Sequence, residues 1–201
     1  MFSRDTHIKP MNNNQFPDLQ TPAILNPSAF DELQRLLDTV PQCYSDGRRR
    51  YLLTGGLPVE LITGRRRFHK DVDIVILQRH HRDVWSELKY IDSRTPENYW
   101  GHLDIQPEYF DETAWPTKLN IHGRAIVVMS VHPAILMVQK LTDHIHLVPR
   151  RIDLTDVANL VDFMRSGQHQ WNQVLDAAVD AVPVGNRGAT RNRLAQFGLP
   201  R

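Results

Sequence analysis

The chain has 201 residues, of which 41% are hydrophobic and 23% charged, so it holds enough apolar material for one packed domain. Its formal net charge of +1 argues against a protein dedicated to binding duplex DNA. The sequence has no run of the roughly 18 apolar residues that a membrane span needs, and no apolar signal core at its N-terminus. A single cysteine excludes an internal disulfide, and we expect a cytoplasmic protein with no membrane partner.

The first part of the chain predicts a loose arm and then a helix. Residues 1–27 carry proline and asparagine without hydrophobic periodicity, and we expect them to form a flexible arm. In residues 28–41, apolar side chains recur at helical spacing. Ser28 and Asp31 resemble a capping box, and Pro41 ends the helix.

A strand, a turn with two glycines, a short helix and a second strand follow. The hydrophobic run at residues 51–54 predicts the first strand, and the glycines directly after it predict the turn. Pro58 suits the first turn of a helix that Gly64 ends. Residues 71–77 predict a second strand that is buried beyond its first residues.

The rest of the chain predicts a helix at 78–91, a strand at 102–106, a hairpin at 117–130 and then helices. We therefore expect an α/β (α+β) fold, in which helices flank a mixed, partly antiparallel sheet and a small helical part follows. The last residues have no acidic side chain and weak periodicity, and we expect a basic, mobile tail. The expected parts are an arm at 1–27, a core at 28–131, a C-terminal helical part at 132–182 and a tail at 183–201.

Two carboxylates open the second strand. Residues two apart on a strand share a face, so Asp71 and Asp73 would project together about 7 Å apart. At an effective dielectric of about 20 they would repel by roughly 2 kcal/mol, which is tolerated if water or a cation surrounds them. Magnesium prefers hard oxygen ligands and keeps places for water and substrate phosphates. The pair is therefore a candidate magnesium site, with a plain surface loop as the alternative.

A phosphate-binding turn and a third carboxylate would complete such a site. Gly55 and Gly56 lie before a helix N-terminus, where exposed amides bind phosphate, and antiparallel pairing of the two strands would bring them to the same edge as Asp71. Asp104 stands in an apolar strand pattern and could bind metal or accept the proton of an attacking hydroxyl. The arginines at 65–67 suit an anionic ligand. Alternatively, the glycines form only a tight turn and Asp104 faces solvent.

The segment "LTGGLPVELITGRRRFHKDVDIVIL" resembles the polymerase-β-like nucleotidyltransferase superfamily. The signature of that superfamily is a strand, Gly-Gly or Gly-Ser, a helix and a strand with Asp-x-Asp, with a third carboxylate further on. The segment is most similar to the small bacterial branch that includes the lincosamide and aminoglycoside nucleotidyltransferases. That branch has a Gly-Arg, a basic stretch and a His-x-Asp-x-Asp, and Gly64, Arg65, His69, Asp71 and Asp73 stand in those places.

The C-terminal half is similar to a second branch, the abortive-infection (AbiE) type toxin nucleotidyltransferases. The segment "PAILMVQKLTDHIHLVPRRIDLTDVANL" offers the helical lysine and the charged opening of the next helix as Lys140, Arg150, Asp153 and Asp156. This resemblance implies that Lys140 neutralises a triphosphate and that Asp153 orients the triphosphate or the acceptor. Asp153 would also suit a helix N-cap.

Together the resemblances imply an enzyme that moves a nucleoside monophosphate from an NTP to a hydroxyl of a small molecule, a tRNA or a protein and releases pyrophosphate. An antitoxin would be a further partner. Two Mg²⁺ ions would be held by Asp71, Asp73 and Asp104, and these three, Lys140 and Asp153 would be catalytic. The implied nucleotide-binding residues are Thr54, Gly55, Gly56, Arg65, Arg67, His69 and Lys140. The alternatives are a catalytically silent nucleotide-binding or toxin-partner module of the same fold, and a glycosyltransferase that uses Asp-x-Asp.

Overall fold

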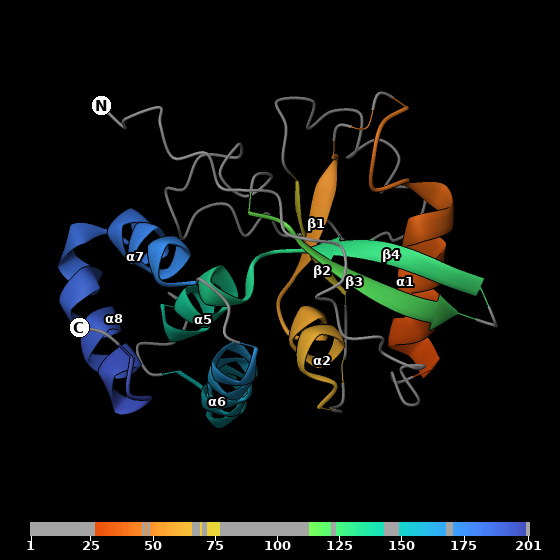
Figure 1. Ribbon diagram of the computed structural model, residues 1–201. Helices are drawn as coiled ribbons and strands as arrows, with labels where there is room; N and C mark the ends of the chain where they lie inside the picture. Colours follow the sequence, from red (N-terminus) through yellow and green to blue (C-terminus); the bar gives the residue numbers. More distant parts are fainter. Residues whose placement is uncertain are drawn as a thin grey trace.

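The computed structural model describes residues 27–45, 47, 49–65, 69, 72–76, 113–121, 124–142, 149–167 and 171–199. Within these ranges, strands β1 to β4 form a sheet and helices surround it (Figure 1). The strands are β1 (Tyr51–Thr54), β2 (Asp73–Ile76), β3 (Trp115–Ile121) and β4 (Arg124–Ser130). The helices are α1 (Pro27–Thr39), α2 (Leu57–Thr63), α5 (Pro133–Leu141), α6 (Arg151–Ser166), α7 (Asn172–Ala181) and α8 (Val184–Gln196).

The sheet is mixed, with the strand order β2-β1-β4-β3. β1 pairs antiparallel with β2 and parallel with β4, and β3 and β4 form an antiparallel pair. This confirms the expected mixed, partly antiparallel sheet flanked by helices. The register places Thr54, the last residue of β1, opposite Asp73, the first residue of β2. The turn that follows β1 therefore lies beside the start of β2.

β1 is buried along its whole length because apolar side chains cover both faces of the sheet. Tyr51 and Leu53 belong to one apolar cluster with Leu33 and Leu36 of α1. Leu52 belongs instead to the cluster that contains the C-terminal helices. Because side chains alternate along a strand, a continuous hydrophobic run is what a strand between two apolar layers requires.

The C-terminal helices gather beside the sheet, on the side away from α1 (Figure 1). α5 is buried along nearly its whole length, and α6, α7 and α8 pack against it. Pro133 occupies the first turn of α5, where a missing backbone N–H costs nothing. The packing around α5 therefore fixes the position of Lys140, which lies in its last turn.

The end of the chain differs from the mobile tail that we expected. Val184–Gln196 forms α8, and Leu194 and Leu199 are buried in the same apolar cluster as α5. Nη2 of Arg165 in α6 also donates a hydrogen bond to the backbone oxygen of Phe197 at 2.8 Å. The buried side chains of α8 are Thr190 and Leu194, which leave little hydrophobic periodicity in the sequence.

Several expected segments lie outside the described residues, namely the helix at 78–91, the strand at 102–106 and nearly all of the arm at 1–27. In the ranges that are described, α6 begins at Arg151, directly after its N-cap residue Arg150. None of the helices found in those ranges has the length and apolar character needed to cross a membrane.

Candidate functional site

The turn after β1 brings a glycine backbone against the carboxylate that opens β2. Gly55 has φ +72°, in the left-handed region that favours glycine. A Cβ built on Gly55 would lie 2.0 Å from Oδ2 and 3.0 Å from Cβ of Asp73, so a larger residue would collide with this aspartate. The Asp73 carboxylate therefore lies directly on the backbone of the turn, and Gly56 is the N-cap of α2. The antiparallel pairing anticipated from the sequence produces this contact.

The remaining acidic members of the predicted metal site, Asp71 and Asp104, lie outside the described residues, as does Arg67. Asp73 is half-buried at the start of β2. Among the residues that the structure describes, no three His, Cys, Asp or Glu side chains gather to form a metal site. Asp73 nevertheless supplies a carboxylate, which is the kind of hard oxygen donor that magnesium prefers.

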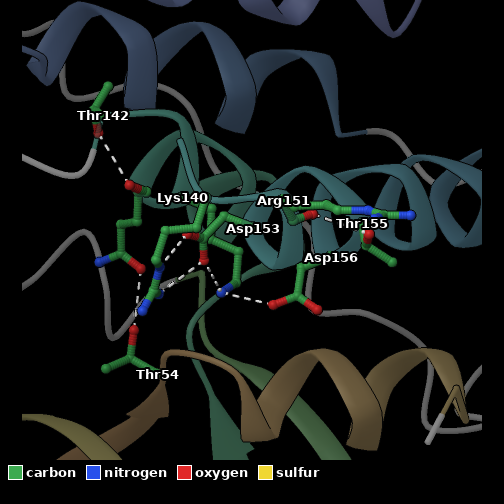
Figure 2. A network of polar contacts seen from close by, with 9 residues as sticks. Thr54, Lys140, Thr142, Arg151, Asp153, Thr155 and Asp156 are labelled. Atoms are coloured by element: carbon green, nitrogen blue, oxygen red, sulfur yellow. Dashed lines mark hydrogen bonds and ion pairs between the residues drawn. The ribbon is translucent and has the colours of Figure 1, made fainter. Parts of the chain in front are cut away.

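Lys140 of α5 lies between two carboxylates of α6 (Figure 2). Its Nζ is 2.7 Å from Oδ2 of Asp156 and 3.2 Å from Oδ1 of Asp153. The Lys140 side chain is 8% exposed, and those of Asp156 and Asp153 are 1% and 3% exposed. Residues three apart on a helix share a face, which is why both carboxylates reach the same ammonium. Buried charges persist when they are paired in this way.

Arg150, the N-cap residue of α6, completes this charged cluster. Its Nε donates to Oδ2 of Asp153 at 2.7 Å and its Nη2 donates to Oδ1 at 3.1 Å, which is the two-pronged geometry that guanidinium and carboxylate groups favour. Burial alone would raise the pKa of Asp153, but the Arg150 hydrogen bonds and the Lys140 charge outweigh it and lower this pKa. With Asp156, the cluster holds two basic and two acidic side chains.

A hydrogen bond connects the charged cluster to the glycine turn. Oγ1 of Thr54, the residue before Gly55, donates to Oε1 of Gln139 at 3.0 Å. Gln139 directly precedes Lys140, and Figure 2 shows Thr54 at the end of its strand facing the Lys140 and Asp153 side chains. The turn that contacts the β2 carboxylate and the buried lysine are thus neighbours, although they are far apart in sequence.

Two other predicted nucleotide-binding residues have partners away from this cluster. Nε2 of His69 lies 2.6 Å from Oε2 of Glu60 in α2, and both side chains are buried. Arg65, which follows α2, contacts the surface of α6. Its Nη1 donates to Oδ1 of Asn159 at 2.8 Å and its Nη2 donates to Oδ2 of Asp162 at 3.0 Å. These contacts anchor the segment between α2 and β2.

Sequence reasoning gave no role to Gln139 and no separate role to Asp156. The position of Asp156, three residues after Asp153, was the available signal, because it places a second carboxylate on the helix face that carries the first. Gln139 carries no comparable signal, since its role depends on where β1 ends in space.

No protein-family model matches this chain, and no curated protein sequence matches it either. The functional conclusion therefore depends on the sequence motifs and on the geometry of the glycine turn and the charged cluster.

Proposed function

We propose that this protein is a magnesium-dependent nucleotidyltransferase, which transfers a nucleoside monophosphate from an NTP to an acceptor hydroxyl. The observation that carries the proposal is the contact between Gly55 and Asp73. It lies at the end of β1, where Thr54 also donates a hydrogen bond to Gln139 of α5, the residue before Lys140. Nucleotidyl transfer requires a metal ligand, a backbone that phosphate oxygens can approach closely and a positive charge. This region offers the carboxylate of Asp73, the glycine turn and the buried ammonium of Lys140.

The carboxylates of Asp71, Asp73 and Asp104 are the residues that would hold magnesium. Bound there, magnesium would offset the negative charge of the triphosphate and of the oxygen that leaves with pyrophosphate. Gly55 permits this arrangement because it has no side chain, and a side chain at this position would displace Asp73.

In the proposed reaction, an oxygen of the acceptor attacks the α-phosphorus, the bond to the β-phosphate breaks and pyrophosphate leaves. Asp104 would accept the proton of the attacking hydroxyl. Lys140 would donate to the phosphate chain, and Asp153 would orient Lys140 through their 3.2 Å contact. Most of the rate enhancement would come from positioning and charge, as in phosphoryl transfer generally.

The test follows a radioactive α-phosphate from each common NTP, with magnesium, into the RNA, protein and small-molecule fractions of a cell extract. Wild type is compared with Asp73→Asn and with Asp180→Asn, a matched control at an exposed position that pairs with Arg191. We expect labelling by wild type and by Asp180→Asn, and a loss of about 100-fold or more in Asp73→Asn. The labelled fraction then identifies the acceptor class.

Two negative results have different meanings. A wild-type protein that neither labels any fraction nor binds any NTP with magnesium contradicts the proposed function. A wild-type protein that binds an NTP without labelling any fraction supports the catalytically silent module instead.

A further inference from the structure

Asp156 is the carboxylate that Lys140 approaches most closely, and the contacts of Asp156 differ from those of Asp153. The Asp156 contact with Nζ is 2.7 Å, against 3.2 Å for Asp153. Asp153 also accepts two hydrogen bonds from Arg150, so its charge is shared between two cations. Arg150 is 56% exposed and can be solvated, whereas Asp156 and Lys140 are both more than nine-tenths buried.

The two carboxylates of α6 fix where the Lys140 ammonium stands. Nζ donates a hydrogen bond to Oδ1 of Asp153 at 3.2 Å. Oδ2 of Asp156 lies 2.7 Å from Nζ as an ion pair rather than a hydrogen bond. Because an ammonium has three N–H donors, it can donate to a phosphate chain while it keeps both carboxylate contacts.

We propose that Asp156 is a positioning residue, which holds the Lys140 ammonium where it meets the phosphate chain of the NTP. This inference rests on the proposed function. Asp156 acts through Lys140 and touches no substrate, so its effect on nucleotide binding requires the lysine. A purely structural Asp156 would instead affect nucleotide binding to the same degree whether or not Lys140 is present.

A double-mutant cycle separates these two roles. The affinity of the full-length protein for the NTP that wild type binds most tightly, with magnesium, is measured by calorimetry. The cycle consists of wild type, Asp156→Asn, Lys140→Met and the double variant, with Asp180→Asn as the control for an isosteric change elsewhere. Urea unfolding of each protein shows that it is folded at the temperature used.

We expect Asp156→Asn and Lys140→Met each to weaken NTP binding about tenfold or more, because each disturbs a charge-assisted contact. The double variant should bind as weakly as Lys140→Met alone, and Asp180→Asn should bind like wild type. If Asp156→Asn does not fold, Asp156→Ser, which is smaller and also uncharged, takes its place in the cycle.

The outcomes that overturn the inference are distinct from failure of the proposed function. Wild-type affinity in the Asp156 variant overturns the inference and leaves the function standing. An equal further loss when the Asp156 change is added to Lys140→Met also overturns it, since Asp156 then acts without the lysine. A wild-type protein that binds no NTP overturns the proposed function, and the inference falls with it.

Discussion

Replacing Gly55 with alanine should both strain the turn and displace Asp73. At φ +72° an L-residue costs about 1–2 kcal/mol relative to glycine. The new Cβ would lie 2.0 Å from Oδ2, 2.8 Å from Cγ and 3.0 Å from Cβ of Asp73. Rotation of the aspartate relieves the first two contacts but leaves the third, so part of the overpacking cost of about 1–3 kcal/mol remains. We expect a total destabilisation that exceeds the backbone cost alone and reaches at most about 5 kcal/mol.

Gly47 provides a matched control for the backbone cost. Its φ is +85°, also left-handed, but among the described residues beyond its chain neighbours a Cβ there would meet no atom within 4 Å. Gly47→Ala should therefore lose only the conformational cost of about 1–2 kcal/mol. The difference between the two variants isolates the contact with Asp73.

Urea unfolding followed by circular dichroism measures both variants, and the labelling assay measures activity. Because a displacement of about 1 Å at a reacting centre can cost roughly 100-fold in rate, Gly55→Ala should lose activity far beyond its loss of stability, while Gly47→Ala keeps it. Equal destabilisation by Gly55→Ala and Gly47→Ala would refute the contact between the turn and Asp73.

Two further predictions concern the charged cluster and α8. The pKa of Asp153 is lower in the folded chain than in the unfolded chain, so the unfolded chain takes up this proton first as pH falls. The stability that Asp153 contributes is therefore present above its ordinary pKa of 3.8 and is lost as pH falls through the lowered value. Thermal unfolding of Asp153→Asn should accordingly depend less on pH below about 5 than wild type does, and identical pH profiles would contradict the ion pairs drawn for this residue. Leu194→Ala, at a buried position of α8, should destabilise the protein by about 2–5 kcal/mol in urea, whereas Val184→Ala, at an exposed position of the same helix, should change stability by less than about 0.5 kcal/mol. A wild-type stability in Leu194→Ala would mean that α8 does not pack on the core.

Local signals in the sequence predict the part of the fold around the glycine turn. A short hydrophobic run gives β1, Pro58 and Gly64 mark the helix after it, and the short connection to β2 makes antiparallel pairing accessible. Proline and glycine constrain their own backbone directly, so these features need no knowledge of distant contacts.

The features that the sequence did not predict depend on contacts between distant segments. α8 is held by Leu194 and Leu199, which carry too little periodicity to predict a packed helix. The pairing of His69 with Glu60 depends on how the segment after α2 returns to that helix, which neither residue reveals on its own. Likewise, Asp156 gains its role only when α5 and α6 pack side by side.

A crystal structure with magnesium and a non-hydrolysable NTP analogue would show whether the glycine turn and the β2 carboxylate form a nucleotide site. We expect the triphosphate at the turn of Gly55, with magnesium between its oxygens and the carboxylates of Asp71, Asp73 and Asp104. Lys140 should contact the phosphate chain. A nucleotide bound elsewhere, or Asp104 on the opposite face of the sheet from Asp73, would contradict it.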